Sequence, residues 1–140
     1  MSKKPSVLFL CVANSARSQL AEGLARSFFA GRMQVMSAGS KPSGTVHPGA
    51  LEELKNRGIG TSDLFSKSVE TIPRNFLEQL DFVVTLCAEE ECPVIITQAK
   101  RVHWPLPDPA SEKDSQVQKL AFQRCAESIL SHFKAWDVRF

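Results

Sequence analysis

Residues 7–18 read Val-Leu-Phe-Leu-Cys-Val-Ala-Asn-Ser-Ala-Arg-Ser, an apolar run of strand length followed by a short loop and the opening of a helical pattern. The predicted strand ends at Cys11, and Arg17 follows after five residues, where the predicted helix opens. Backbone N–H groups of a tight loop and of a helix N-terminus converge on one point, which favours an oxyanion and a thiolate. An arginine can hold a tetrahedral oxyanion through two parallel hydrogen bonds. We therefore predict a nucleophile and a substrate-binding loop made of Cys11, Val12, Ala13, Asn14, Ser15, Ala16, Arg17 and Ser18.

A purely structural interpretation makes Cys11 a buried thiol at a strand end and Arg17 a solvated helix residue. It leaves unexplained why small polar residues replace hydrophobic ones across the loop. In the functional interpretation Ser18 hydrogen-bonds the Cys11 sulfur, and Asn14 holds the loop in a strained shape. Alternatively, Asn14 or Ser18 only stabilises a turn or caps the helix.

Composition excludes several classes of protein. The chain has 140 residues, of which 43% are hydrophobic, and a formal net charge of +2. These values predict one domain over residues 1–140 and give no argument for a nucleic-acid or membrane partner. No run is long enough to span a membrane, and the polar start is too short for a signal peptide. We expect a cytoplasmic monomer. In such reducing surroundings the four cysteines are not expected to form structural disulfides, so any pairing among them is expected to be catalytic or regulatory.

The order of apolar and helical patterns predicts the fold class. Strands alternating with helices indicate an α/β fold, here a single-domain, four-stranded parallel sheet with helices on both faces. Ligands bind beyond the carboxyl ends of such strands, which is where Cys11, Cys87 and Asp108 are expected to meet. The expected strands lie at 7–10, 34–36, 82–86 and 101–104, and the expected helices at 18–30, 48–57, 90–99 and from about 115 onward.

The last helical pattern carries an apolar stripe at helical spacing that is expected to face the sheet. Cys125 belongs to this stripe and is expected to be a packed small hydrophobic residue without a redox role. The stripe consists of Val117, Leu120, Ala121, Cys125, Ile129, Phe133 and Trp136.

Two further cysteines follow the third predicted strand. Cys87 emerges at the carboxyl end of that strand, and Cys92 follows after Ala-Glu-Glu-Glu. In a regular helix their Cα atoms would lie roughly 8 Å apart, whereas a disulfide needs about 4.4–6.8 Å, so the pair can bridge only in a loop or unwound segment. The glutamates keep neighbouring thiols protonated, which suits resolving cysteines that react with a disulfide or adduct presented to them. Otherwise Cys87 is a strand-end core residue and Cys92 an incidental surface thiol.

Asp108 lies between Pro107 and Pro109, after the last predicted strand. The prolines restrict the backbone on both sides, so the direction of the carboxylate is largely fixed before a substrate binds. A carboxylic acid above the anion-binding loop can protonate a departing oxygen. Taken alone, the same residues form an ordinary Asp-Pro turn.

Four stretches carry a resemblance to a known family. They are Cys-x-x-Asn-x-x-Arg-Ser at 11–18, Ser-Ala-Gly at 37–39, the segment 81–93 with its two cysteines, and His-Trp-Pro-Leu-Pro-Asp-Pro-Ala at 103–110. Together they resemble the low-molecular-weight protein tyrosine phosphatase fold, and within it the branch of arsenate reductases. The resemblance runs from about residue 6 to about residue 135.

The resemblance implies reduction of arsenate to arsenite by a thiol–disulfide relay, as in arsenic detoxification. Cys11 would form a thiol–arsenate adduct with Asp108 as the acid, Cys87 would then attack the Cys11 sulfur, and Cys92 would attack Cys87. An exposed Cys87–Cys92 disulfide would remain for thioredoxin to reduce. Some thioredoxin-linked relatives carry a further cysteine where this chain has Ala16, and the gap between Cys87 and Cys92 is shorter here, so glutathione with glutaredoxin stays an alternative reductant.

The resemblance also implies a cation site. Asn14, Glu22 and Ser37 match positions that surround a potassium ion in some arsenate reductases, and no tightly bound cofactor is expected. Glu22 can equally be a first-turn residue that complements the helix dipole. His47 and His132 are expected to be ordinary surface residues, and His103 to be packed or to lie behind the site. No Cys/His spacing suggests zinc.

Two other functions compete with arsenate reduction. A low-molecular-weight phosphotyrosine or aryl phosphatase would form a phosphocysteine at Cys11 and complete turnover with water, without Cys87 or Cys92. Such a phosphatase usually has an aromatic residue just after Asp-Pro, whereas this chain has Ala110 there and no tyrosine anywhere. A non-catalytic redox or oxyanion sensor would present the segment from Cys87 to Cys92 to a partner, but it would not require a positioned acid.

Overall fold

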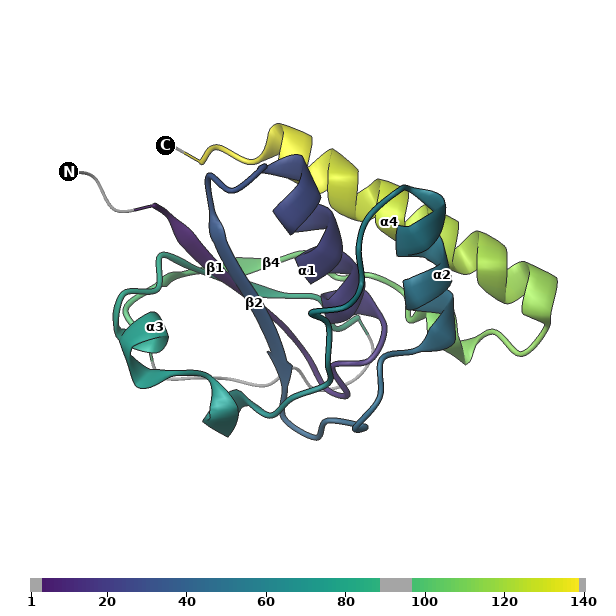
Figure 1. The fold of residues 1–140 in the computed structure, drawn as a ribbon, viewed down its shortest axis with the longest axis horizontal. Coiled ribbons are helices and arrows are strands. Elements are labelled where there is room, and N and C mark those ends of the chain that lie inside the picture. Colours follow the sequence, from purple (N-terminus) through teal and green to yellow (C-terminus); the bar gives the residue numbers. More distant parts are fainter. Residues whose placement is uncertain (1–3, 89–96, 139–140) are drawn as a thin grey trace.

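The predicted strands form one parallel sheet. The computed structural model describes residues 4–88 and 97–138, and over these residues the four strands lie in the order β2-β1-β3-β4 (Figure 1). Strand β1, the central strand of six buried residues, pairs with β2 on one side and with β3 on the other. The bounds are β1 Ser6–Cys11, β2 Gln34–Gly39, β3 Phe82–Thr85 and β4 Lys100–His103.

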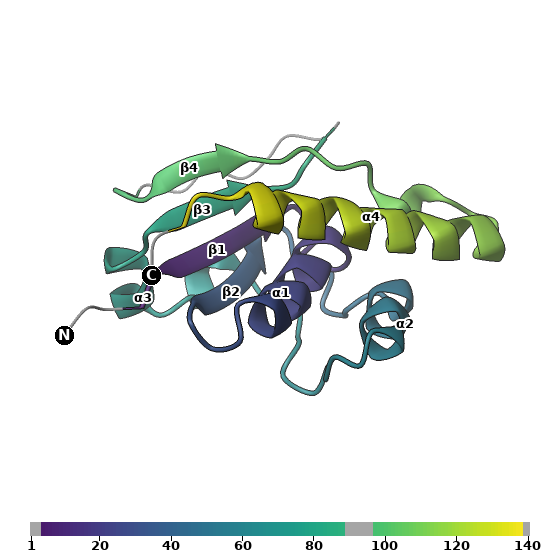
Figure 2. The ribbon, with the colours of Figure 1, turned by 90° about the horizontal axis from the view of Figure 1, so that it is seen from above.

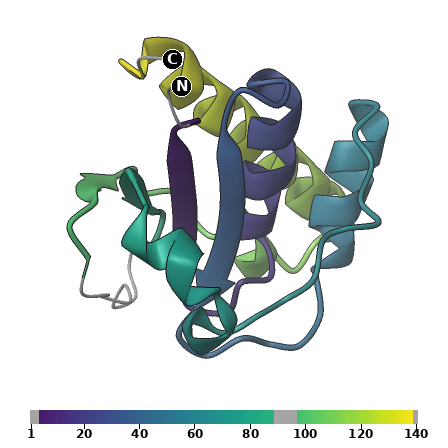
Figure 3. The ribbon, with the colours of Figure 1, turned by 60° about the vertical axis from the view of Figure 1, so that its left-hand side comes forward.

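Helices cover both faces of the sheet, unevenly. Along β1 the side chains alternate, as in any strand: Val7 and Phe9 pack with the long helices, whereas Leu8 and Leu10 belong to a second core cluster with Ile72. The long helices α1, α2 and α4 thus lie on one face, and the short elements η1 and α3 lie on the other (Figures 2 and 3). The prediction of helices on both faces is confirmed. The bounds are α1 Arg17–Phe28, α2 Pro48–Asn56, η1 Val69–Thr71, α3 Arg74–Glu78, η2 Pro109–Ser111 and α4 Ser115–Ala135.

The apolar stripe of α4 faces the core only over the later part of the helix. Val117 and Leu120 are about half exposed, so the prediction that they face the sheet is wrong. The physical reason is the length of α4, whose first turns extend beyond the sheet (Figure 2). The buried residues of the helix are Phe122, Cys125, Ala126, Ile129 and Phe133.

Two differences from the predicted elements concern short segments. The five-residue helix α3 and the turns η1 and η2 were not predicted, because such short segments carry too little periodicity. Most of the helix predicted over 90–99 lies in 89–96, outside the described residues. No helix in the described part of the chain is both long and apolar enough to cross a membrane.

Candidate active site

The backbone carbonyl groups of the loop between β1 and α1 accept hydrogen bonds that hold the loop in place. Five consecutive carbonyl oxygens, those of residues 12–16, accept hydrogen bonds from surrounding groups. The donors are Lys41 N to Val12 O at 2.9 Å, Ser43 N to Ala13 O at 3.0 Å, Gln19 Nε2 to Asn14 O at 3.0 Å, His47 N to Ser15 O at 3.0 Å and Leu20 N to Ala16 O at 2.9 Å.

The same loop leaves its backbone donors available. Within 4–88 and 97–138, the N–H groups of residues 13–16 donate no hydrogen bond to the protein. Helix α1 has Ala16 at its N-cap with no side-chain cap, although Ser, Thr, Asp or Asn normally satisfies the first N–H groups of a helix. Because the carbonyls point away and the N–H groups are unpaired, the loop is preorganised for an oxyanion.

Asn14 fixes the shape of this loop. Its φ of +48° places it in the left-handed region, which asparagine tolerates better than most residues. Its buried side chain donates from Nδ2 to Ser18 Oγ at 2.7 Å and to Ser37 Oγ at 3.0 Å. These bonds tie the loop to α1 and to β2.

Cys11 is a buried free thiol at the end of β1. Its Sγ lies 2.8 Å from Ser18 Oγ. Because Ser18 Oγ accepts from the Asn14 amide, its own proton is free to point at the sulfur, where it stabilises a thiolate. The predicted Ser18–Cys11 contact is therefore present.

Arg17 is buried at the start of α1 and is hydrogen-bonded to the segments that follow β3 and β4. Its Nη1 donates to Leu106 O at 3.0 Å and, more weakly, to Leu86 O at 3.5 Å. These carbonyls fix the guanidinium beside the loop before any ligand binds. Leu86 directly precedes Cys87, so the backbone that leads to the second cysteine contacts the predicted anion clamp.

Asp108 shares a pocket with Cys11 and Arg17. Its Oδ1 accepts from Ala110 N at 3.0 Å and caps the turn η2. Its other oxygen, Oδ2, has no hydrogen-bond partner in the described part of the chain. The Asp-Pro turn thus exists and also directs a carboxylate into the site. The pocket of about 160 Å³ is lined by Cys11, Ala13, Ser15, Ala16, Arg17, Ser43, Asp108 and Ala110.

Cys87 follows β3 next to the loop. Leu86 N donates to Leu10 O at 3.0 Å, so Cys87 lies one residue beyond the point where β3 is level with Cys11. Cys87 is disulfide-bonded and only 2% exposed. The sequence predicts an exposed Cys87–Cys92 disulfide, and this prediction is wrong for Cys87. Cys92 lies outside the described residues, and its pairing with Cys87 stays a prediction.

Cys125 is the fourth cysteine, a buried free thiol on α4. Burial raises its pKa to about 12 from an ordinary 9.0, Arg17 lowers the pKa in part, and Asp108 and Cys11 raise it further. The thiol is therefore protonated and poorly nucleophilic at neutral pH. Its packing among apolar residues agrees with the sequence prediction.

This shift predicts a specific pH dependence of stability. The folded state keeps the Cys125 proton up to about pH 12, whereas the unfolded thiol loses it near 9.0, so the stabilising contribution is complete below about pH 9 and is lost as pH rises towards 12. In urea unfolding, the stability difference between wild type and Cys125→Ala should stay constant to about pH 9 and then shrink. A difference that grows above that pH would contradict the assignment.

Gly39 permits the close approach of β2 to the loop. A Cβ at this position would lie 2.4 Å from Val12 O and 3.0 Å from Asn14 N. We expect Gly39→Ala to lower the unfolding free energy by about 1–3 kcal/mol. By displacing the loop it should also lower kcat/KM about 100-fold. Gly60→Ala is the matched control, because a Cβ there meets nothing within 4 Å, and equal effects at both positions would contradict the prediction.

Several residues have roles that the sequence did not reveal. Glu22 lies in the second turn of α1, buried against β2, so the first-turn interpretation is wrong. His47 is half-buried and caps α2 through Nδ1, which accepts from Gly49 N at 2.9 Å, and His132 stacks on Trp104 at 4.7 Å, so neither is an ordinary surface residue. His103 is exposed rather than packed, with Nδ1 2.7 Å from Thr85 Oγ1.

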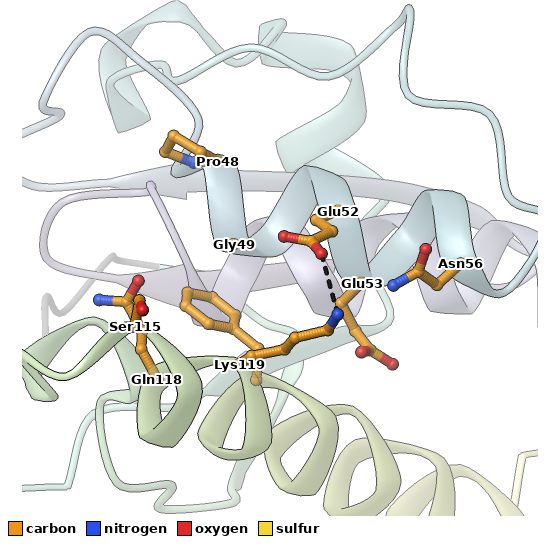
Figure 4. Close-up of a pocket in the computed structure, with 9 residues that line it drawn as sticks. Pro48, Gly49, Glu52, Glu53, Asn56, Ser115, Gln118 and Lys119 are labelled. Atoms are coloured by element: carbon orange, nitrogen blue, oxygen red, sulfur yellow. Dashed lines mark ion pairs between the residues drawn. The ribbon is translucent and has the colours of Figure 1, made fainter.

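A separate hollow of about 160 Å³ lies between α2 and α4 (Figure 4). Lys119 of α4 and Glu52 of α2 form an ion pair of 3.3 Å across it. The hollow shares no lining residue with the Cys11 pocket and contains neither a cysteine nor an arginine. It is an exposed contact between two helices and adds nothing to the chemistry of the loop.

Fold and site together define a class of protein. A central parallel strand delivers a cysteine into a Cys-x5-Arg loop with unpaired N–H groups, and an aspartate lies in the same pocket, as in cysteine-dependent phosphatases. The chain belongs to the low molecular weight phosphotyrosine protein phosphatase family, which it matches over residues 6–138.

Individual relatives are arsenate reductases. Arsenate reductase 2 of Staphylococcus haemolyticus is 36% identical over 138 residues, which cover 97% of this chain and 98% of that protein. A thioredoxin-dependent arsenate reductase of Corynebacterium glutamicum superposes with a TM-score of 0.72 at 30% identity, covering 96% of this chain, which spans 62% of that longer protein. An arsenate reductase in its phosphate-binding state gives a TM-score of 0.70 at 28% identity and covers 94% of this chain and 98% of its own.

Proposed function

We propose that this chain reduces arsenate to arsenite through a thiol–disulfide relay. The observation that carries the proposal is the position of Cys87, two residues past the end of β3, the strand that pairs with β1, at whose end Cys11 lies. Hydrolysis of a phosphate ester needs the loop, Arg17 and Asp108, but it needs no second cysteine at the site. Similarity to arsenate reductases along nearly the whole chain supports the same function.

The first step forms a covalent adduct. Arsenate occupies the loop, where the N–H groups of residues 13–16 and the Arg17 guanidinium share its negative charge. The Cys11 thiolate, held by the Ser18 hydroxyl, attacks arsenic, and an arsenic–oxygen bond breaks. Asp108 gives its proton to the departing oxygen, which leaves as water.

The second step transfers two electrons to arsenic. The Cys87 thiolate attacks Sγ of Cys11, a sulfur–sulfur bond forms, and the sulfur–arsenic bond breaks. The electron pair of the broken bond stays on arsenic, so As(V) leaves as As(III) in arsenite while two thiolates become one disulfide. Cys92 then attacks Cys87, and Cys11 is released as a thiolate.

A dithiol reductant closes the cycle, and we propose thioredoxin in this role. It would transfer two electrons to a Cys87–Cys92 disulfide and itself become a disulfide. Because Cys87 is buried, direct attack of the reductant on its sulfur would be disfavoured, since exchange depends on access to the sulfur attacked. The gap between Cys87 and Cys92 is shorter than in thioredoxin-linked relatives, so glutaredoxin with glutathione is the alternative reductant.

We propose a cytoplasmic monomer that needs no tightly bound cofactor. A reducing compartment would keep Cys11 available as a thiol between turnovers. The electrons for turnover come from an external dithiol, and the negative charge of the substrate is met by the loop and Arg17.

One coupled assay tests the reaction and the reductant together. NADPH oxidation is followed with arsenate, thioredoxin and thioredoxin reductase, and then with glutathione, glutaredoxin and glutathione reductase. Turnover with thioredoxin is the expected result, and turnover only with glutaredoxin would keep the reductase but change its partner. Failure with both reductants, together with hydrolysis of an aryl phosphate, would make the protein a phosphatase.

Phosphatase activity is the second candidate function. The family permits it, and phosphate-ester hydrolysis would use the same three pocket residues as arsenate reduction, namely Cys11, Arg17 and Asp108. The residue that lines the pocket after Asp-Pro is Ala110, which offers no ring to sandwich an aryl substrate. We therefore expect only weak aryl phosphate hydrolysis, arising from the same Cys11 thiolate.

A further inference from the structure

Lys67 is a buried lysine that none of the proposed steps uses. Its side chain is 5% exposed, and its Nζ lies 3.3 Å from Oε1 of Glu22, which is 1% exposed. The ammonium also donates to Phe65 O at 3.2 Å and lies 4.5 Å from the centroid of the Phe65 ring. An ammonium and a carboxylate are rarely buried unless they are paired, so this ion pair is a built feature of the core behind the loop.

The backbone of Lys67 orients Asn14. The N–H of Lys67 donates to Asn14 Oδ1 at 2.9 Å, and a backbone N–H is always a donor. The atom it meets must therefore be the amide oxygen, so the amide nitrogen faces Ser18 and Ser37. Gln19 Nε2 donates to the same oxygen at 3.0 Å, which gives the same orientation.

The ammonium of Lys67 contacts Glu22, which is linked to Asn14 through Ser37. Ser37 Oγ accepts from Asn14 and donates to Glu22 Oε1 at 2.7 Å. Lys67 at Oε1 and Arg26 Nη1, 3.0 Å from Oε2, form ion pairs with Glu22. Two hydrogen-bonded paths therefore start at the Asn14 amide: one runs through Ser18 to the Cys11 sulfur, and the other through Ser37 to the Lys67–Glu22 pair.

The residues expected to bind potassium do not fit an ion well. The oxygen of Asn14 already accepts two N–H groups, and Ser37 Oγ is engaged on both sides. Oε1 of Glu22 receives the Ser37 hydroxyl and the ammonium. A monovalent cation among these oxygens would lie beside a like charge in a buried setting, which is unfavourable.

We propose that the Lys67 ammonium takes the place of a bound cation and is a positioning residue for Cys11. It holds Glu22 by an ion pair, and through Ser37 and Asn14 it keeps the Ser18 proton directed at the sulfur. The expected effect on arsenate turnover rests on the proposed function. The expected effect on the reactivity of Cys11 does not, because it follows from the hydrogen bonds around this thiol. Wild-type activity should therefore be independent of potassium.

The first measurement uses the unmodified protein. Turnover and the rate of Cys11 alkylation by iodoacetamide are compared in potassium chloride and in choline chloride at equal ionic strength. Equal rates are expected, and a potassium-specific increase in either rate would overturn the proposal. Alkylation is followed in a Cys87→Ser, Cys92→Ser, Cys125→Ser background, so it reports on the site even where arsenate is not reduced.

The second measurement removes the ammonium. Lys67→Ala without potassium should lose roughly 10-fold to 100-fold in kcat/KM for arsenate, because the thiol is misplaced, and should alkylate more slowly. Potassium or methylammonium should restore both rates, since either places a cation beside Glu22. Lys67→Met, which fills the space without charge, should be slow and unrestored, whereas Lys55→Ala at an exposed lysine of α2 should resemble wild type.

The outcomes separate this proposal from the proposed function. Alkylation of Lys67→Ala that equals wild type, or that added cations never restore, would overturn the role of Lys67 whatever the reaction of the enzyme. Wild type that fails to reduce arsenate while Lys67→Ala shows cation-restored alkylation would overturn only the proposed reaction.

Discussion

Arg17→Ala is expected to lose about 1,000-fold or more in kcat/KM for arsenate, because it removes a charged pair of donors from the oxyanion. A second effect adds to the first. The guanidinium also donates to Leu86 O and Leu106 O, so its loss releases the backbone that leads to Cys87 and to Asp108. The measurement is steady-state turnover with thioredoxin, together with arsenate protection of Cys11 against alkylation.

Two controls separate the chemistry from the fold. Arg74→Ala at an exposed position of α3 should leave turnover within a factor of about two, as surface substitutions usually do. Arg17→Lys keeps a charge but not the two-pronged geometry, and it should remain severely impaired. Turnover near wild type in Arg17→Ala with intact thermal unfolding would exclude Arg17 as the anion clamp.

Cys92→Ser is expected to release one arsenite per protein molecule and then stop. Without the last thiol, the Cys11–Cys87 disulfide cannot be transferred, so Cys11 stays blocked. Cys87→Ser should release no arsenite, because no thiolate is available beside Cys11 to displace arsenic. Rapid-quench measurement of arsenite and mass analysis of the disulfide give the stoichiometry.

The matched control is Cys125→Ser, which should turn over normally because its thiol is buried and protonated. Multiple turnovers of Cys92→Ser with thioredoxin would exclude the three-cysteine relay. A burst of arsenite from Cys87→Ser would show that another thiol, or the reductant itself, attacks the adduct.

Much of the fold could be predicted because its signals are local. The six residues of β1 are buried on both faces of the sheet, and such central parallel strands have uninterrupted apolar sequences. Helix α1 begins at Arg17, one residue before the predicted start. The exposure of Val117 and Leu120 could not be predicted, since periodicity shows the apolar side of a helix but not how far its packing partners extend.

Some residues of the candidate site could likewise be predicted from local sequence, and others could not. Cys11, Arg17 and Asp108 were visible as a spacing and a proline-flanked acid, and the structure brings them into one pocket. Ser43 also lines that pocket, but its segment reads as an ordinary turn. Lys67 gave no signal, because a lysine among serines predicts a solvated loop, and only tertiary structure shows that it is buried against Glu22.

The outward-tied carbonyls of the loop have a consequence for selectivity. N–H groups and a guanidinium recognise the shape and charge of a tetrahedral anion, not its central atom, so we expect arsenate and phosphate to compete for the loop. Discrimination then arises after binding, since arsenic accepts the electron pair from a sulfur–arsenic bond and phosphorus does not. The selectivity of such an enzyme would be kinetic, and phosphate is expected to act as a competitive inhibitor that is released unchanged.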